Sequence, residues 1–403
     1  MPFCPQGWSL RSAYASRYRS VYLKVAIVAG KSITPHMGGQ GTFCAGLATG
    51  LLRLGHDVDL LVLDQPDWRH WVLTNAPTGR IAVRAPSPGS LAAADIVHVN
   101  TPWLRVLLLG VFLRRPMVVT HQDFTAVCPA RTAWARAGKC TVANGDLGPC
   151  RHCPAQNWGP RTRLRLQAAI LRRVANVAVS ACLRDRLAIS DSILSPLDAD
   201  GMADLAEEAT QPRAAYVGRL SPEKGVEIAI RALTELPSEV ELDIYGDGPL
   251  RQGLEGEAAQ LRLQERVHFH GHVSAPGLRA RAAALFVVPS LWDEPFGYVT
   301  AECMAAGKAV IAAATGASPE LLGLERGWLV PPGDPSALAG AIREVLASPD
   351  ERVRRGRLAR QFVLNRLTSL GVARSYEEVY RRVLGHHASG HRMTFGTSWM
   401  RGE

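Results

Sequence analysis

The sequence predicts an α/β protein of two domains, each built on a parallel sheet with helices on both faces. Three observations support this fold class. The chain has 403 residues, which is more than one hydrophobic core usually serves. Short apolar segments rich in β-branched residues alternate with helical patterns, as in βαβ units. Apart from an irregular insertion at 122–160, the alternation stops between Pro196 and Pro212, where no strand pattern occurs and a domain boundary is expected.

The elements of the first half follow a strand–helix–strand order. Residues 24–30 form a short apolar run typical of a buried parallel strand. A glycine-rich loop at 36–41 and a helix at 42–54, ending before Gly55, come next. Four further strands are predicted, at 58–63, 95–99, 116–120 and 177–180. Two more helices are predicted, a buried or amphipathic one at 106–113 and one at 161–175.

In the second half the same alternation restarts. Strands are predicted at 214–217, 240–245, 266–269, 285–289 and 309–311, and closing helices at 335–347 and 350–384. The predicted division of the chain is a basic N-terminal extension (1–23), an N-terminal Rossmann-like domain (24–196) with a Cys-rich insertion (122–160), a linker (197–212), a C-terminal Rossmann-like domain (213–365), a helix that packs back toward the first domain (366–385) and a flexible tail (386–403).

The net charge of the chain restricts the classes of partner that it is expected to bind. The formal net charge is +10, which suits nucleic acid, an anionic membrane or a phosphorylated ligand. No nucleic-acid module is recognisable, so nucleic acid is not expected. Five arginines fall between Arg161 and Arg173, on a predicted helix whose basic side is either a solvated face or a contact with anionic lipid. With no apolar run of spanning length and no secretory signal pattern, we expect a cytoplasmic protein, with peripheral membrane contact as an open alternative.

One motif has the chemistry of a diphosphate site. Gly218-Arg219-Leu220-Ser221-Pro222-Glu223-Lys224-Gly225 leaves a strand and opens a helix. Backbone N–H groups and the helix dipole at such a point favour an anion. Arg219 adds a bidentate fork and Lys224 a compact charge. An ordinary surface loop with two exposed cations is the alternative. Tyr245-Gly246-Asp247-Gly248-Pro249, another turn after a strand, is a weaker signal.

A second motif supplies paired carboxylates. Pro289 to Gly297 follows a strand and runs on to Glu302, so that seven residues separate Glu294 from Glu302. One carboxylate at a loop and one about two helical turns further on could accept hydrogen bonds from hydroxyls at two ends of a sugar nucleotide. A single Glu on a helix is usually just solvent-exposed, but this spacing behind Pro-Phe-Gly makes that explanation weaker.

Together these motifs resemble glycosyltransferase family 4, retaining enzymes with the GT-B fold. The resemblance rests on Gly-Arg-Leu with the following Lys-Gly, Gly-Asp-Gly-Pro and Glu-Pro-Phe-Gly-x4-Glu, in matching order from Ala214 to about Val345. Gly316-Ala-Ser-Pro-Glu320 and Gly327-Trp-Leu-Val-Pro-Pro-Gly-Asp334 also fit. The first half matches through Gly38-Gly39, the helix ending at Gly55-His56 and the strand ending at His121. The chain departs from the family pattern at Ser195-Pro196-Leu197-Asp198, at Gly316-Ala317 and at Gln122.

The resemblance implies a role for each matching residue. Arg219 and Lys224 would bind the donor diphosphate, Glu294 the donor sugar and Glu302 the ribose. A further group would lie close to sugar or phosphate: His121, Gly218, Gly246, Phe296, Gly297 and Tyr298. Gly38 and Gly39 would approach the donor phosphate or the acceptor. Arg219, Lys224, Glu294 and His121 are the expected catalytic residues. The implied reaction is retaining transfer of a glycosyl group from a nucleoside diphosphate sugar to an unidentified acceptor, without a metal cofactor.

A cysteine cluster lies in the insertion. Cys128, Cys140, Cys150 and Cys153 end in a Cys-x-x-Cys pair with metal-ligand spacing. The first two are irregularly spaced, so the cluster is either a structural zinc site or a set of free thiols. A zinc ribbon that binds RNA is a further alternative, weakened by the small size of the insertion. A sugar-nucleotide epimerase and a catalytically inactive accessory GT-B subunit are the other functions considered, and the presence of Arg219 and Glu294 argues against the second.

Overall fold

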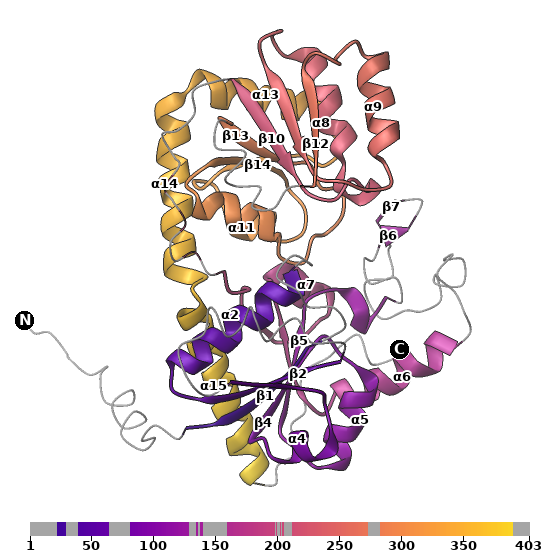
Figure 1. Cartoon of the computed structure of the whole chain (residues 1–403), viewed down its shortest axis with the longest axis vertical. Coiled ribbons are helices and arrows are strands. Elements are labelled where there is room, and N and C mark those ends of the chain that lie inside the picture. Colours follow the sequence, from indigo (N-terminus) through magenta and orange to yellow (C-terminus); the bar gives the residue numbers. More distant parts are fainter. Residues whose placement is uncertain are drawn as a thin grey trace, which may run out of the picture.

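The computed structural model describes residues 22–29, 39–63, 81–128, 134–135, 138–139, 159–197, 199, 202, 204, 212–272 and 283–389. Two α/β domains lie one above the other, joined on one side by a long helical segment (Figure 1). Each domain contains one parallel sheet with helices packed against it. The predicted fold class is therefore confirmed.

The N-terminal domain contains a seven-stranded sheet in the order β3-β2-β1-β4-β5-β8-β9, in which every neighbouring pair is parallel. Its central strands β1, β4 and β5 are mostly apolar and are buried except for Lys24, as expected for a sheet with helices on both faces. The elements are β1 (Lys24–Ala29), α2 (Gly39–Arg53), β2 (Asp57–Val62), β3 (Ile81–Arg84), α4 (Pro88–Ala92), β4 (Ile96–Asn100), α5 (Leu104–Phe112), β5 (Met117–His121), a 3-10 turn (Phe124–Ala126), the hairpin β6 (Trp134–Ala135) and β7 (Gly138–Lys139), α6 (Gly159–Leu171), β8 (Ala175–Ala178), α7 (Ala181–Arg186) and β9 (Asp191–Ser192).

The C-terminal domain contains a six-stranded parallel sheet in the order β12-β11-β10-β13-β14-β15. The elements are β10 (Arg213–Val217), a 3-10 turn (Pro222–Lys224), α8 (Val226–Ala232), a second 3-10 turn (Leu233–Glu235), β11 (Glu241–Tyr245), α9 (Arg251–Gln260), β12 (Val267–Gly271), β13 (Leu285–Val288), α11 (Tyr298–Ala305), β14 (Ala309–Ala313), α12 (Ser318–Leu322), β15 (Trp328–Val330), α13 (Pro335–Ala347), α14 (Pro349–Arg366) and α15 (Ser369–Ala388).

The last helix belongs in space to the first domain. α15 packs along α2 (Figure 1), and the two backbones approach so closely that a Cβ on Gly50 would lie 2.0 Å from the carbonyl oxygen of Ser369. Deeper in the interface, Tyr380 Oη is 2.6 Å from Nδ1 of His98 in β4. Both side chains are buried, and burial lowers the pKa of His98 to about 3, so its ring stays neutral.

The chain crosses between the domains twice, at one place. The first crossing passes Leu197 and the second passes Leu367, whose carbonyl oxygen accepts a hydrogen bond of 2.7 Å from the Leu197 N–H. Two chain segments that are joined by a hydrogen bond at one point permit rotation of one domain against the other more readily than translation. The cleft between the domains therefore has a defined hinge side.

The structure corrects several predicted boundaries. α2 begins at Gly39 rather than residue 42, so the end of the predicted glycine loop is helical. The helix predicted at 350–384 is two helices, α14 and α15. The Thr368 side chain accepts a hydrogen bond from the N–H of Gly371 and starts α15 anew. α15 continues to Ala388, three residues into the predicted flexible tail, and its last turn is held by a contact of 3.0 Å between His387 Nε2 and the Arg114 carbonyl oxygen.

The start of the first domain also differs. Leu23 is the last residue of the predicted N-terminal extension, but its side chain is buried and its N–H donates to Nδ1 of His56 at 3.1 Å. Five short strands, β3, β6, β7, β9 and β15, have no counterpart among the predicted strands. β15 occupies the Trp328–Val330 segment, whose three residues are too few to show a period.

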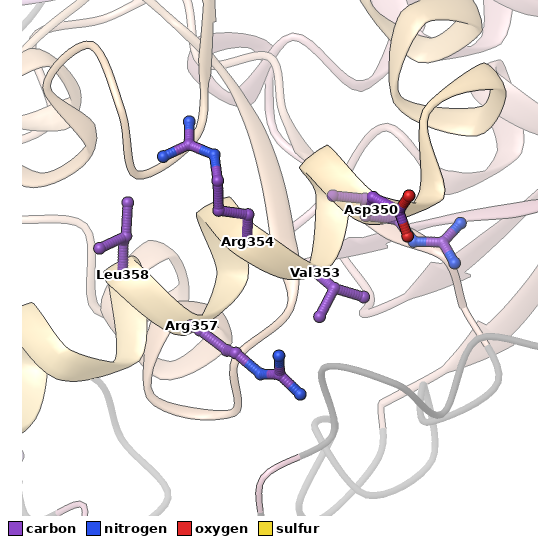
Figure 2. A pocket seen from close by; sticks show the side chains of 6 residues that line it. Asp350, Val353, Arg354, Arg357 and Leu358 are labelled. Atoms are coloured by element: carbon purple, nitrogen blue, oxygen red, sulfur yellow. The ribbon is translucent and has the colours of Figure 1, made fainter.

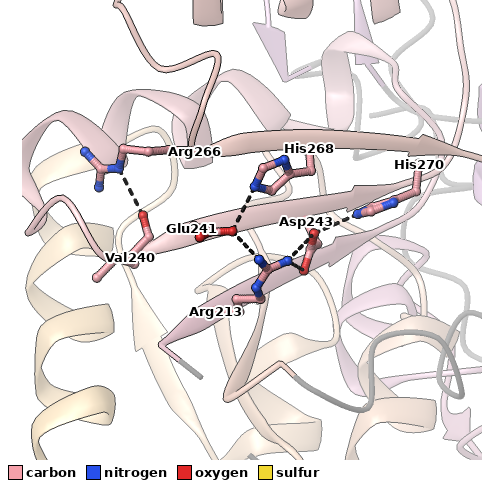
Figure 3. A network of polar contacts seen from close by, with 7 residues as sticks. All are labelled: Arg213, Val240, Glu241, Asp243, Arg266, His268 and His270. Carbon is pink, nitrogen blue, oxygen red and sulfur yellow. Dashed lines mark hydrogen bonds and ion pairs between the residues drawn. The ribbon is translucent and has the colours of Figure 1, made fainter. Parts of the chain in front are cut away.

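An ionic network braces the open edge of the C-terminal sheet (Figure 3). Asp243 in β11 accepts from Arg213 of β10 and from Nε2 of His270 in β12, at 3.2 and 2.7 Å. Glu241, two residues earlier on the same face, pairs with Arg213 and lies 2.8 Å from His268 Nε2. Because three strands contribute, the network ties the edge strand β12 to the centre of the sheet.

Candidate active site

A pocket of about 390 Å³ lies between the two domains, at the carboxyl ends of their strands. Ligands of open α/β sheets bind at these ends, and clefts between domains are favoured sites. The lining residues come from the start of α2, the segment after β5, the loop after β10 and the segment from β13 to α11. They are Gly39, Gln40, Gln122, Asp123, Val179, Ser195, Tyr216, Val217, Gly218, Arg219, Lys224, Val288, Ser290, Trp292, Glu294, Pro295, Phe296, Gly297, Tyr298, Val299 and Thr300.

The two predicted diphosphate ligands both reach this pocket. Lys224 Nζ lies 2.7 Å from Oε1 of Glu294 and 5.6 Å from the centre of the Trp292 ring. The other carboxylate oxygen of Glu294 accepts from Ser290 Oγ at 3.2 Å. Arg219 is exposed at the pocket rim. The ion-paired Lys224 and the exposed Arg219 therefore lie on one side of the cavity.

The segment that carries Glu294 is held in place by backbone contacts from a neighbouring loop. Ala317 N–H donates to the Glu294 carbonyl oxygen at 2.9 Å. Gly316, with φ of +55°, lies so close that a Cβ there would be 2.3 Å from both the nitrogen and the carbonyl oxygen of Glu294. Only glycine fits this approach, so the Gly316-Ala317 sequence fixes the carboxylate's position.

The first turn of α11 points at the pocket. The helix begins at Tyr298, and the first N–H groups of a helix have no intrahelical partner. Gly297 and Phe296 precede it and also line the cavity. Together with Lys224, this helix end provides the positive potential that a diphosphate requires.

Tyr298 forms a direct contact between the domains. Its ring lies against the start of α2, where a Cβ on Gly39 would be 2.5 Å from two ring carbons. The hydroxyl is buried close to Ser195, and burial raises the pKa of Tyr298, so it stays protonated. Gly39 thus allows an aromatic ring from the second domain to close on the first.

Glu302 lies two residues after Thr300, the last residue of α11 that lines the pocket. It is partly buried on α11 and is not among the residues that line the cavity. Burial raises the pKa of its carboxyl group to about 7. The paired carboxylates of the sequence motif are therefore in different environments, since Glu294 forms an ion pair with Lys224 whereas burial dominates the surroundings of Glu302.

His121 ends β5 with its side chain inside the protein. Its Nε2 lies 2.9 Å from Oδ1 of Asn176, whose amide group donates to two backbone carbonyl oxygens. Oδ1 must then accept, so the proton of His121 is on Nε2. Burial lowers the pKa of His121 to about 4, and Nδ1 has no hydrogen-bond partner among the described residues. The ring is neutral and is not among the pocket-lining residues, whereas Gln122 and Asp123 are.

The remaining predicted site residues have different outcomes. Gly218 lines the pocket, whereas Gly246 does not and instead abuts the Gly218 carbonyl oxygen. Gly38 lies outside the described residues, as do Cys140, Cys150 and Cys153. Cys128 is partly exposed after the 3-10 turn that follows β5, and the described residues contain no cluster that could hold a metal ion. The zinc site thus stays a prediction.

Sequence reasoning missed several residues of the cavity wall. Gln40 donates to Oγ1 of Thr101 at 3.0 Å and thereby joins the start of α2 to the end of β4. Two buried donors, Nε1 of Trp292 and Oγ1 of Thr300, have no partner within the described part of the chain. Both residues line the pocket. Their position directly after a strand and in the first turn of the following helix was the available signal.

A larger pocket of about 620 Å³ lies along α14 (Figure 2). Its described lining comes from one helix only, including Asp350, Arg354 and Arg357. Arg354 is already bonded to Glu351 through two nitrogens, at 2.6 and 2.8 Å. Since no second element is described as contributing groups, the cleft pocket is the better candidate for the active site.

Comparison with known proteins agrees with this geometry. The family model of glycosyl transferases group 1 matches residues 200–362, the domain that carries Arg219, Lys224 and Glu294. An uncharacterized glycosyltransferase of Methanocaldococcus jannaschii is 25% identical over 356 residues, which cover 81% of this chain and 89% of that one. Residues 200–362 thus match the group 1 glycosyl transferases, and most of the chain is similar to glycosyltransferases of this type.

Two further matches each cover most of this chain. The alpha-maltose-1-phosphate synthase of Mycolicibacterium smegmatis is 25% identical over 396 residues, covering 86% of this chain and 96% of that enzyme. Among solved structures, Anabaena HepE in complex with UDP superposes with a TM-score of 0.70 at 20% identity, covering 89% of this chain and all of that one. The match extends through both domains, so the GT-B architecture is confirmed.

None of the helices in the described part of the chain is long and apolar enough to cross a membrane.

Proposed function

We propose that this glycosyltransferase moves a sugar from a nucleoside diphosphate sugar to an acceptor hydroxyl, with the anomeric configuration retained. The observation that carries the proposal is the convergence of Lys224, Arg219 and the first turn of α11 on one cavity that also contains Glu294. The complexes of Anabaena HepE with UDP and with UDP-glucose support a donor of this class.

In the proposed reaction the bond between the anomeric carbon and the diphosphate oxygen breaks, and a bond to the acceptor oxygen forms on the same face. The barrier is the separation of an oxocarbenium-like sugar from an anionic leaving group. Arg219, Lys224 and the N–H groups of α11 stabilise the leaving charge, and preorganised terms of this kind are often the largest in catalysis. The leaving phosphate oxygen takes the acceptor's proton.

The carboxylates that line the described cavity support this front-face route over a covalent intermediate. Glu294 is engaged by Lys224 and Ser290. Asp123 accepts from the N–H of Thr125 at 2.8 Å and from Gln40 at 3.5 Å. Both therefore have positioning partners, and Glu294 is suited to accept hydrogen bonds from sugar hydroxyls.

Two buried hydrogen-bond donors without a partner among the described residues support the same proposal. Trp292 Nε1 and Thr300 Oγ1 each need an acceptor, and a sugar diphosphate offers several. Glu302 would contact the ribose in the complex with the donor. Its carboxyl group needs to be ionised to accept from two ribose hydroxyls.

A thermal-shift experiment tests the donor site. The purified protein is titrated with UDP, GDP, ADP, dTDP and CMP, in parallel with Arg219→Ala/Lys224→Ala and with Arg343→Ala, which changes an exposed arginine on α13 that does not line the cavity. One nucleoside diphosphate should raise Tm by mass action in the native protein and the α13 control but not in the double variant. No shift with any nucleotide in the folded protein would contradict the proposal, and a shift without donor turnover would indicate a binding subunit.

A further inference from the structure

The outer layer of α5 and α6 exposes apolar side chains that nothing else in the described chain covers. Eight large apolar residues of the described part are exposed, and four of them lie on these two helices. Phe112 is the most exposed of the four, at 79%. The others are Leu108 and Val111 on α5 and Leu166 on α6. A clustering of this kind marks an interaction surface more often than scattered single residues do.

The two helices form one layer. α5 connects β4 to β5 and α6 connects β5 to β8, and these strands follow one another in the same direction across the sheet. Right-handed crossovers therefore place both helices on the same face. They contact each other and lie side by side at one flank of the domain (Figure 1). The opposite layer differs, because α15 covers α2 there.

The charge around the apolar residues has one sign. The sequence contains no Asp or Glu between Asp95 and Asp123, or between Asp146 and Asp185. The exposed arginines of the layer are Arg105, Arg114, Arg165, Arg172 and Arg173. Arg105, Leu108 and Phe112 follow at helical spacing, so they share one stripe of α5. An apolar stripe flanked by arginines, on helices that contain no acidic residue, is complementary to an anionic lipid surface.

We propose that the α5–α6 layer docks the protein peripherally on an anionic lipid bilayer, with Phe112 and Leu108 inserted at the headgroup level and the arginines paired with lipid phosphates. The sequence indicated only the arginines of α6 as a candidate contact, with a solvated face as the alternative. The apolar stripe on α5, exposed next to them, decides between the two.

The position of α5 links this surface to the reaction. The helix starts three residues after Thr101, which is hydrogen-bonded to the pocket residue Gln40, and its nine residues span about 14 Å. A bilayer against the outer layer would therefore lie close to the rim of the cleft. Resting on the proposed function, this placement favours an acceptor hydroxyl carried by a lipid.

Vesicle co-sedimentation tests the docking surface without any donor. The full chain is mixed with vesicles of phosphatidylcholine alone, or of phosphatidylcholine with phosphatidylglycerol. The variants are Leu108→Ser/Phe112→Ser and Arg105→Gln/Arg165→Gln. Two matched controls lie on the other domain: Leu324→Ser, at a residue 88% exposed, and Arg343→Gln. A nucleotide thermal shift on every variant checks that folding and donor binding are intact.

We expect binding to the anionic vesicles only, with loss at high salt. The apolar double variant should bind about tenfold or more weakly, from the transfer energy of a phenylalanine. Each arginine should contribute about fivefold, and both controls should bind like the native chain. Equal binding to both vesicle types, or unchanged binding of the α5 variants, would overturn the proposal. A dimer that Phe112→Ser dissociates, without vesicle binding, would assign the layer to contact between copies instead. A nucleotide shift that fails in a chain that still binds vesicles would remove the donor proposal and leave this one standing.

Discussion

The two walls of the cleft are built in different ways. On the C-terminal wall, backbone contacts fix the loops: Ala317 bonds to Glu294, and Gly316 permits an approach that no other residue could make. On the N-terminal wall, side chains do most of the positioning, as Gln40 bonds to Thr101 and Gln122 bonds to Asn100. A wall fixed by backbone presents the same groups whatever the neighbouring side chains are. A wall built from side chains can be altered by single substitutions.

This difference suits two different tasks. A site for a sugar nucleotide donor has to hold the diphosphate in one geometry, whereas an acceptor site has to be adjusted to its substrate. The contrast also predicts where substitutions should have graded or abrupt effects. Changes on the C-terminal wall should abolish donor use or folding, and changes on the N-terminal wall should alter affinity.

The largest effect should come from the cations of the C-terminal wall. Arg219→Ala and Lys224→Ala should each lower kcat/KM for nucleoside diphosphate release from the sugar donor by about 10²–10³, because each removes a charge from the leaving-group side. Initial rates of nucleotide release measure this, with Arg343→Ala as the control. A loss below tenfold for both would mean that the helix end alone stabilises the leaving group.

Next in size is a stability effect confined to the same wall. Gly316→Ala should destabilise the protein by about 3 kcal/mol or more, because the residue has a left-handed backbone and its Cβ would overlap the Glu294 backbone. Gly39→Ala is the matched change on the N-terminal wall. It meets only the ring of Tyr298, which can turn away, so its Tm should stay near the native value while donor KM rises. Equal Tm losses in both would contradict the contrast between the walls.

Glu302 predicts a pH dependence of donor affinity. Its carboxyl pKa is raised to about 7 by burial, and ribose hydroxyls bond best to the ionised form. Below this pH a proton has to leave before the donor binds, so affinity should fall up to tenfold per pH unit and level off above it. Calorimetry with a sugar nucleotide, whose diphosphate diester does not titrate in this range, measures the slope. Glu302→Gln should remove the slope.

The same group acts on stability with a defined sign. A carboxyl whose folded pKa lies above its unfolded value binds protons more tightly when folded. Its contribution is therefore present below about pH 4.5 and is lost as the pH rises to about 7. Glu302→Gln should raise Tm relative to the native chain at pH 8 and leave it unchanged at pH 4. A Tm difference that does not vary with pH would assign the effect to packing.

Sequence reasoning recovered the fold because strand and helix periods are local. It recovered Arg219, Lys224 and Glu294 as neighbours because they follow adjacent strands of one sheet, β10 and β13. It could not find Trp292 or Thr300 as pocket donors, since their importance depends on having no partner in three dimensions. It misjudged the end of α15, because the contact that extends this helix joins His387 to Arg114, residues far apart in the chain.

The smallest expected effect concerns the contacts that join the two walls. Arg186 of α7 lies 3.5 Å from Asp293, and the N–H of Ala181 donates to Glu320 at 2.7 Å. Both bonds connect α7 to the donor loops, so they favour a closed cleft. Partly exposed pairs contribute about 0.2–1 kcal/mol, so Asp293→Asn/Glu320→Gln should raise donor KM less than fivefold.

The control for this last change is Asp191→Asn, which removes another partly exposed pair, the one with Arg382, away from the cleft. Small-angle scattering without nucleotide should show a larger radius of gyration for the α7 variant than for the native chain or the control. Saturating nucleotide should cancel the difference, because a ligand held by both walls supplies the closing energy that the variant lacks. An unchanged radius would mean that Tyr298 against Gly39 is sufficient to hold the walls together, and the comparison would then rest on that single contact.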